Sequence, residues 1–188
     1  FRKLHPHNKI SIYANDVHKT KMNIGDSRRH FHTEISKYKI HDYKEEPTMS
    51  KVAVVYWSGT GNTALMAQAV AEGAKAKGAE CDLLTSAEFT VDMVDNYDAI
   101  AFGCPAMGAE VLEESEFEPM FAECEPALNG KKIAIFGSYG WGSGEWMDTW
   151  EAQCQADGAV FAAAPLICHE TPDEAGLADC TALGEALV

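Results

Sequence analysis

Basic side chains are scarce over most of this 188-residue chain. Residues 49–188 contain 5 Lys, no Arg and 23 Asp or Glu, whereas residues 1–48 contain 10 Lys or Arg and 6 Asp or Glu. The formal net charge of the whole chain is −14 at pH 7. Because a surface this acidic repels nucleic acid and anionic membranes, we expect neither as a partner. We expect partner proteins with basic docking faces instead.

Long apolar segments and paired cysteine motifs are also lacking. No apolar run approaches the length of a transmembrane helix, and no segment has the apolar region of a signal peptide. The six cysteines form no C-x-x-C motif and have no metal-site spacing, so we expect no metal centre. Most of them lie among apolar residues, which favours buried free thiols over disulfides. Free thiols indicate a reducing compartment, and we therefore expect a cytoplasmic protein.

The first 48 residues show neither the helical nor the strand period convincingly. They hold six of the seven histidines, which share no clear helical face that would bind a metal. Their acidic residues argue against a transit peptide. Met49 resembles a start immediately before the first apolar run, and Lys44-Glu45-Glu46 would have purine-rich codons, as a bacterial ribosome-binding site has. We expect residues 1–48 to be an N-terminal extension, disordered or translated from an upstream region, and residues 49–188 to form one folded domain.

From Met49 onward, apolar runs alternate with segments of helical period. The first run, Val52–Trp57, is unbroken and rich in Val, which is typical of a parallel strand buried on both faces. The alternation predicts an α/β fold, a doubly wound five-stranded parallel sheet with helices on both faces. The predicted strands comprise residues 52–57, 80–84, 99–103, 133–136 and 160–167.

The segments between these runs predict helices. The helix after Thr63 is expected to end near Gly78, a C-terminal cap. A weak helical turn is expected around residues 91–94. Apolar residues three or four apart predict buried helix faces, namely Phe117, Phe121 and Cys124, then Trp146, Trp150 and Cys154, and finally Leu177, Cys180, Leu183 and Leu187. The last helix is expected to begin with a capping box over residues 171–174, with Pro172 at its first position.

A glycine-rich segment connects the first strand to the first helix. Its two glycines allow a tight bend, so that several N–H groups can converge on one anion at the helix N-terminus. Hydroxyl and amide side chains add hydrogen-bond donors, and the segment contains no Lys or Arg. It therefore predicts a phosphate site, which consists of Ser58, Gly59, Thr60, Gly61, Asn62 and Thr63.

Two further loops are expected at the same edge of the sheet. One follows the third strand and covers residues 104–110, and the other follows the fourth strand and covers residues 137–144. Ligands of doubly wound sheets bind outside the carboxyl ends of the strands, where the strand order reverses. Trp141, in the second loop, is poorly placed for the core, and an exposed indole favours a ligand that covers it. The three loops together predict one ligand site.

Three segments of these loops carry a resemblance to a known family: residues 55–63, 104–108 and 137–146. In their order and spacing, the chain from Met49 to Val188 resembles a short-chain flavodoxin of the anaerobic clostridial type. The resemblance implies strand order 2-1-3-4-5 and bound FMN at the point of strand reversal, as in flavodoxins as a class. It implies a low-potential one-electron carrier that substitutes for ferredoxin, using the quinone, semiquinone and hydroquinone states of FMN, and not an enzyme with its own substrate.

The resemblance also implies roles for single residues. Trp141 would stack on the outer face of the flavin and Met107 on its inner face. The Gly108 peptide would flip, so that its carbonyl accepts the proton on flavin N5 in the semiquinone, while Glu110 would bind flavin N3. Ala109 departs from relatives that have Asp or Ser there. The complete predicted FMN site adds to the six phosphate-site residues Pro105, Ala106, Met107, Gly108, Glu110, Ser138, Tyr139, Gly140, Trp141 and Gly142.

Partners and alternatives follow from the same comparison with known families. The resemblance implies a monomer whose redox partners are ferredoxin-type reductases, pyruvate oxidoreductase and hydrogenase. The alternative is an FMN-dependent NAD(P)H:quinone reductase, which shares the fold but needs extra loops for its second substrate. A receiver-type signalling module would need acids where Trp57-Ser58 stands and an Asp near Gly103-Cys104, and a low-molecular-weight phosphatase would need an Arg in its phosphate loop. A dinucleotide site is disfavoured because Asp82 lies in mid-strand.

Overall fold

The computed structural model describes residues 49–188, and the expectations for residues 1–48 lie outside the described residues. Strands and helices alternate along the described chain. The strands are β1 (Lys51–Tyr56), β2 (Glu80–Thr85), β3 (Ala99–Gly103), β4 (Lys132–Tyr139), β5 (Val160–Phe161) and β6 (Leu166–His169). The helices are α1 (Asn62–Ala76), α2 (Phe117–Cys124), α3 (Glu145–Ala156) and α4 (Glu174–Ala186), with 3₁₀ helices η2 (Ser86–Glu88), η3 (Val91–Asn96) and η4 (Glu125–Ala127).

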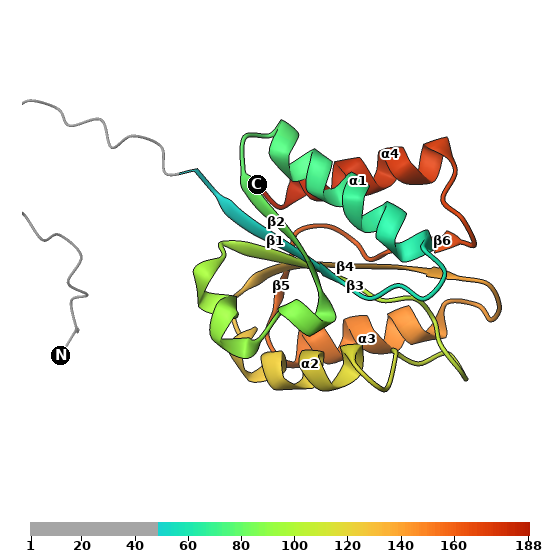
Figure 1. Ribbon diagram of the computed structural model, residues 1–188. Coiled ribbons are helices and arrows are strands. Elements are labelled where there is room, and N and C mark those ends of the chain that lie inside the picture. Colours follow the sequence, from blue (N-terminus) through green and yellow to red (C-terminus); the bar gives the residue numbers. More distant parts are fainter. Residues whose placement is uncertain (1–48) are drawn as a thin grey trace, which may run out of the picture. The chain divides into compact units, whose positions relative to one another are not determined.

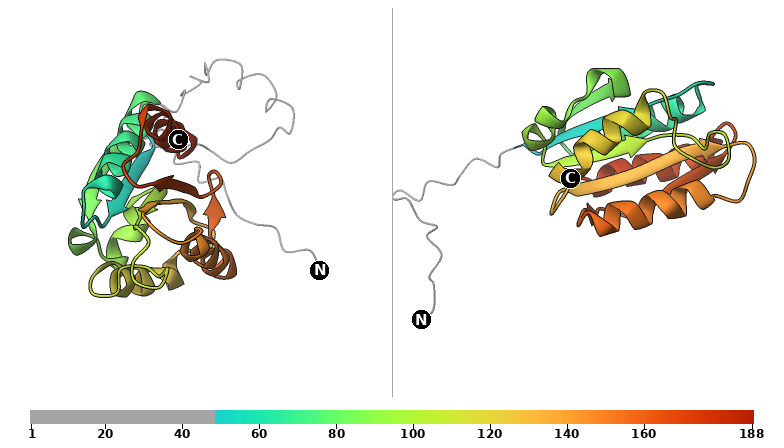
Figure 2. Two further views of the ribbon diagram at one scale, coloured as in Figure 1. Left: turned by 90° about the vertical axis from the view of Figure 1, so that its right-hand side faces the viewer. Right: turned by 90° about the horizontal axis from the view of Figure 1, so that it is seen from below.

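The strands form one parallel sheet in the order β2-β1-β3-β4-β5, and β6 also pairs with β4. This confirms the predicted doubly wound sheet and the order 2-1-3-4-5. Helices α1 and α4 cover one face of the sheet, and α2 and α3 cover the other (Figure 1; Figure 2). Because every pairing is parallel, the carboxyl ends of all strands meet at one edge, at the right of Figure 1.

Alternate side chains of β1 enter two separate cores. Val52 and Val54 pack in the cluster that includes residues of α1 and α4. Ala53 and Val55 pack in the cluster that includes residues of α2 and α3. All four side chains are fully buried, which explains why the strand is apolar without interruption.

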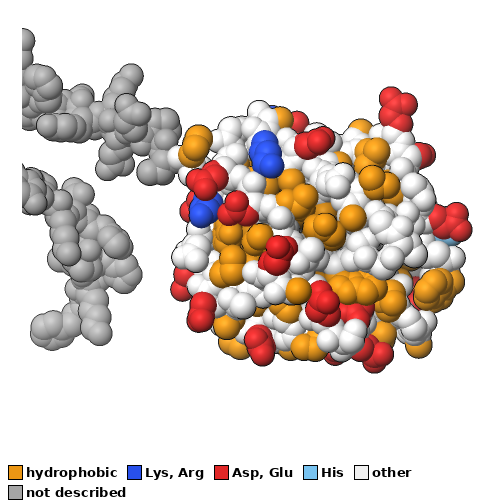
Figure 3. Space-filling model, viewed as in Figure 1, with side chains coloured by type: hydrophobic (Ala, Val, Ile, Leu, Met, Phe, Trp, Pro, Cys, Tyr) orange, Lys and Arg blue, Asp and Glu red, His pale blue; other side chains and the backbone are white. Residues whose placement is uncertain are grey.

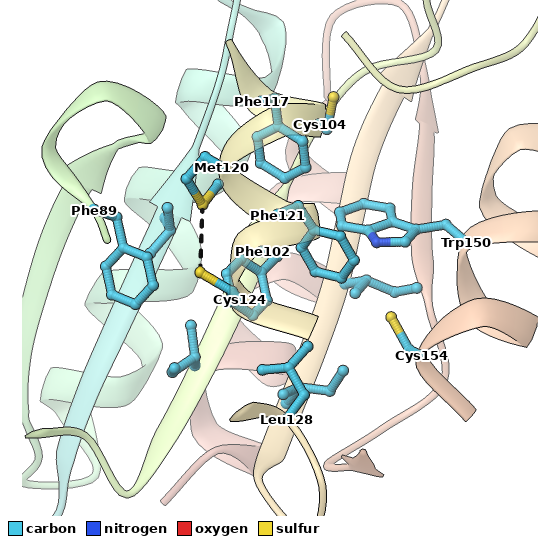
Figure 4. Close-up of a cluster of buried hydrophobic side chains, with 14 of the residues drawn as sticks. Phe89, Phe102, Cys104, Phe117, Met120, Phe121, Cys124, Leu128, Trp150 and Cys154 are labelled. Carbon is cyan, nitrogen blue, oxygen red and sulfur yellow. Dashed lines mark hydrogen bonds between the residues drawn. The ribbon is translucent and has the colours of Figure 1, made fainter. Parts of the chain in front are cut away.

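The core between the sheet and helices α2 and α3 is built on aromatic rings (Figure 4). Phe121 lies edge-on to both Phe102 and Trp150, with ring centroids 5.2 and 5.4 Å apart. Edge-on packing favours the ring quadrupoles in addition to burying apolar area. Trp146, Trp150 and Cys154 of α3 are all buried, which confirms the prediction that this stripe belongs to the core.

The fifth strand is interrupted, whereas the sequence predicted one strand over residues 160–167. Phe161 pairs with Ile133 and Leu166 with Phe136, so residues 162–165 lie opposite only two residues of β4. Pro165 has no N–H to donate to β4, and the extra residues leave the sheet before β6 resumes it. The interruption is short, because only residues 162–165 separate β5 from β6.

The predicted start of the last helix is wrong by two residues. The N-cap is Asp173, whose carboxylate accepts a hydrogen bond of 2.8 Å from Gly176 N, and α4 begins at Glu174. Pro172 therefore precedes the cap. The Thr171 hydroxyl, expected to cap this helix, donates instead to Asn62 Oδ1 at 3.0 Å. A long-range contact has replaced the local one.

Helices α1 and α4 pack together through two glycines. A Cβ added at Gly184 would lie 1.9 Å from the Val70 carbonyl oxygen, and one at Gly73 would lie 2.0 Å from the Thr181 carbonyl oxygen. The two backbones are thus too close for any side chain at either position. Within the described residues no helix is long and apolar enough to cross a membrane.

We expect Gly184→Ala to lower the free energy of unfolding by about 2 kcal/mol, because the new methyl group must push the helices apart. Ala182→Ser, at an exposed position of the same helix, should change it by less than about 0.5 kcal/mol. Urea unfolding of both variants measures the difference. Equal stabilities would contradict the close packing of α1 on α4.

Candidate functional site

Four loops at the carboxyl edge of the sheet surround a cavity of about 260 Å³, here called the edge cavity. The loops follow β1, β3, β4 and β6. Neutral and aromatic side chains predominate in its walls, and Glu170 is the one charged residue among those that line it in the described chain. The lining residues are Trp57, Gly59, Thr60, Asn62, Pro105, Ala106, Met107, Ser138, Tyr139, Gly140, Trp141 and Glu170.

The glycine-rich loop presents the N-terminus of α1 to this cavity. Gly61, the N-cap, has φ of 95°, a left-handed conformation that glycine adopts without a steric penalty. The first backbone bond of the helix runs from Leu65 N to Gly61 O. The N–H groups of residues 62–64 therefore have no intrahelical acceptor, and the helix dipole adds partial positive charge there. This arrangement binds an anion without a basic side chain.

Two side-chain hydrogen bonds hold the glycine-rich loop against neighbouring elements. The buried hydroxyls of Thr63 and Ser138 lie 3.0 Å apart and join the start of α1 to β4. The Thr171 hydroxyl joins Asn62 to the segment after β6. The loop is therefore fixed from both sides before any ligand binds.

Trp141 and Met107 contribute apolar walls of the edge cavity. The Trp141 side chain is 55% exposed, which confirms that it lies outside the core. Its indole Nε1 donates a hydrogen bond of 3.2 Å to the Gly108 carbonyl oxygen. An exposed indole at the mouth of a cavity is a surface that a flat ligand can cover.

Glu110 lies beside the edge cavity and does not line it. Its Oε1 accepts hydrogen bonds from Ser143 N at 2.9 Å and from Gly144 N at 2.8 Å. Gly144 is the N-cap of α3. In this structure the Glu110 carboxylate therefore binds the start of a helix. Its contact with flavin N3 stays a prediction.

The structure brings ten of the predicted site residues together in the walls of the edge cavity: Gly59, Thr60, Asn62, Pro105, Ala106, Met107, Ser138, Tyr139, Gly140 and Trp141. Ser58 and Gly61 line a neighbouring hollow. Thr63 is buried behind the loop, and Gly108, Glu110 and Gly142 lie in the two loops without lining the cavity. Binding roles for all sixteen residues stay predictions.

Two residues of the cavity, Trp57 and Glu170, were not predicted as site residues, and the ends of two strands, β1 and β4, differ from the prediction. Trp57 was assigned to the first strand, but β1 ends at Tyr56 and the indole lines the cavity. Glu170 follows β6, and the rule that ligands bind at carboxyl ends of strands could have identified it. Ser138 and Tyr139 were expected in a loop, yet β4 continues through both because it pairs with β6 as far as Tyr139.

The loop after β3 is anchored by a buried carboxylate. Glu113 N donates to Cys104 Sγ at 3.3 Å, and Glu113 Oε2 accepts from Glu116 N and Phe117 N, both at 2.9 Å. Burial disfavours the charged form, but hydrogen bonds from Ser115, Phe117 and Glu116 outweigh it and lower the pKa of Glu113. The carboxylate is therefore ionised at neutral pH and holds the loop where α2 begins.

The cysteines agree with the expected free thiols. All six are free and five are buried. Burial raises the pKa of Cys104 to about 12, so its thiol stays protonated and poorly nucleophilic near neutral pH. Residues 49–188 contain no group of three or more His, Cys, Asp or Glu arranged to hold a metal ion.

Comparisons with known proteins identify relatives of this fold and site. A family model described as Flavodoxin matches residues 54–184. The chain is 47% identical to a flavodoxin of Megasphaera elsdenii and 45% identical to one of Clostridium beijerinckii, over 72% and 71% of this chain and 96% of each relative. The solution structure of the two-electron reduced Megasphaera elsdenii flavodoxin aligns with a TM-score of 0.67, covering 72% of this chain and 97% of that one.

The conformation of Gly108 gives a prediction for the ligand-free protein. Its φ is +49°, and an added Cβ would meet nothing closer than Val111 Cγ2 at 3.8 Å. Gly108→Thr should therefore lower the free energy of unfolding through backbone strain, by about 1–2 kcal/mol, and Gly108→Asn should cost less. Urea unfolding, with Ala109→Thr as the control, measures both. Equal losses for Gly108→Thr and Ala109→Thr would contradict this conformation.

Proposed function

The chain belongs to the flavodoxin family, and from that membership we propose that it carries single electrons at low potential in place of a ferredoxin. As a flavodoxin it is an electron carrier that uses FMN. One observation carries the assignment of the edge cavity as the FMN site. The unpaired N–H groups at the N-terminus of α1 lie at an apolar cavity that an exposed indole borders.

The residues present fit the phosphate end of FMN. The N–H groups of residues 62–64 and the Thr60 hydroxyl would hold a phosphate dianion at the positive end of the helix dipole. No Lys or Arg lines the cavity among the described residues. A terminal phosphate satisfies this set of donors, and no adenine site is needed.

The residues also fit the ring. When bound, FMN supplies the redox centre, an isoalloxazine ring that accepts and releases electrons. Trp141 and Met107 would cover that ring and exclude water from it. The Trp141 indole is held by the Gly108 carbonyl oxygen at 3.2 Å, so this wall is positioned in advance.

Negative charge near the ring supports a low potential. Glu170 lines the edge cavity and Glu110 lies beside it, so both oppose the negative charge that reduction adds. For one electron, each 1.4 kcal/mol of such repulsion lowers the potential by about 59 mV. Two carboxylates in partly exposed positions would lower it by a fraction of that amount each, because solvent screens them.

The acidic surface supports partners with basic docking faces. Figure 3 shows acidic side chains spread over one face of the molecule and few basic ones. We propose that a monomer exchanges electrons with ferredoxin-type reductases, pyruvate oxidoreductase and hydrogenase, and binds neither nucleic acid nor membranes. Charge complementarity of this kind speeds encounter more than it adds affinity. The six cysteines are free thiols, which supports the proposal that the protein functions in the reducing cytoplasm.

We propose further that the protein has no substrate of its own. The relatives that it matches over 96% of their length are flavodoxins, and the interruption between β5 and β6 spans only residues 162–165. A quinone reductase would need longer loops to seat a second substrate. That alternative is therefore not favoured.

The direct test of this assignment is the identity of the bound chromophore. We expect the purified full-length protein to release FMN, because the loop at α1 fits a terminal phosphate. Mass spectrometry of the released chromophore distinguishes FMN from FAD and riboflavin. Release of FAD, or failure of the ligand-free protein to bind added FMN, would overturn the assignment.

A further inference from the structure

The loop that carries Trp141 is joined to the turn that carries Met107 by polar contacts. The turn is closed by two backbone bonds between Met107 and Val111, 2.9 and 3.0 Å long. One contact to the loop is the bond from Trp141 Nε1 to Gly108 O. The other is the pair of bonds from Ser143 N and Gly144 N to Glu110 Oε1, here called the Glu110 bridge.

The Glu110 bridge has the features of a strong contact. Both donors are backbone N–H groups at the N-terminus of α3, where the helix has unpaired donors and a positive dipole end. The acceptor is a carboxylate oxygen, and charge-assisted hydrogen bonds are about twice as strong as neutral ones. Glu110 has φ of 55°, a conformation that non-glycine residues rarely adopt, so its surroundings must hold it there.

The Glu110 bridge occupies space that is free only because Gly142 has no side chain. A Cβ added at this position would lie 2.2 Å from Glu110 Oε1 and 2.3 Å from Glu110 Cδ. Any side chain at position 142 would therefore displace the carboxylate from its two donors. The residue next to Trp141 is thus fitted to a carboxylate that comes from another loop.

We propose that Glu110 is a positioning residue, whose bridge holds the loop of residues 140–144 so that Trp141 stays at the mouth of the edge cavity and slows the loss of FMN. This role acts through backbone groups and is separate from any contact between Glu110 and the flavin. The effect on FMN loss rests on the proposed function. The hold on the loop of residues 140–144 does not, because the Glu110 bridge is present without ligand.

The first test measures the loop in the ligand-free, full-length protein. Hydrogen exchange of the Ser143 and Gly144 amides, followed by NMR, should be at least about tenfold faster in Glu110→Ala, the factor expected for loss of a charge-assisted bond. Glu110→Gln should give an intermediate rate, because its amide oxygen accepts without charge. Glu114→Ala removes an exposed acid that is not an acceptor of either amide and should change neither exchange rate.

The second test is a double-mutant cycle that separates the bridge from backbone strain. Gly142→Ala should also speed exchange of the Gly144 amide, since its methyl group displaces the carboxylate. In a Glu110→Ala background the same change should add little, because no carboxylate remains to displace. Strain from the positive φ of Gly142, which is +82°, is common to both backgrounds and cancels.

The third test measures FMN release from the loaded protein by flavin fluorescence. FMN should dissociate severalfold faster from the Glu110→Ala and Gly142→Ala variants than from the parent protein. Its dissociation from the Glu114→Ala variant should be unchanged. Gly142→Ala displaces the carboxylate without removing it, so faster FMN release in step with faster amide exchange ties the loss of FMN to the bridge. If Glu110→Ala does not fold, Glu110→Gln and Gly142→Ala carry the first and third tests.

Any one of three results would overturn the proposal. The Ser143 and Gly144 amides could exchange at the parent's rate in Glu110→Ala, or the effects of Glu110→Ala and Gly142→Ala on exchange could be fully additive. FMN could also leave a variant at the parent's rate although its amides exchange faster. A parent protein that does not bind FMN would overturn the proposed function instead. In that case the exchange rates still decide whether the Glu110 bridge holds the loop.

Discussion

Parallel hydrogen bonding between β1, β3 and β4 is the constraint on which the rest of the structure depends. Tyr56 pairs with Gly103, and Gly103 pairs with Phe136, so the strands lie in one fixed register. The loops that follow β1 and β3 therefore leave the sheet side by side, next to the continuation of β4. This register brings three parts of the site to one edge of the sheet: the N-terminus of α1, the turn that carries Met107 and the loop that carries Trp141.

Hydrogen bonds between loops then fix what the sheet brings together. Thr63 and Ser138 join the first loop to β4, and Thr171 joins Asn62 to the segment after β6. The Glu110 bridge joins the two loops that flank the edge cavity. A site assembled in this way is largely formed before its cofactor arrives, so less binding energy is lost to ordering.

The parts that the sequence predicted are those set by local patterns. The Val-rich run of β1, the glycines before α1 and the exposed indole of Trp141 each carry their own signal. The parts that it did not predict depend on distant residues. Thr171 bonds Asn62 instead of capping α4, β4 extends because β6 pairs with it, and Glu110 turns to N–H groups more than thirty residues away. Spacing along the chain carries no record of such contacts.

The central claim is that this chain holds FMN so that it passes one electron at a time. Stepwise reduction of the FMN-loaded protein, followed by its visible spectrum and by the measured potential, tests that claim most directly. The account predicts two separate one-electron steps, with a long-wavelength absorption band that rises and then disappears between them. A single two-electron step that shows only the oxidised and fully reduced spectra would contradict it and would favour a quinone reductase.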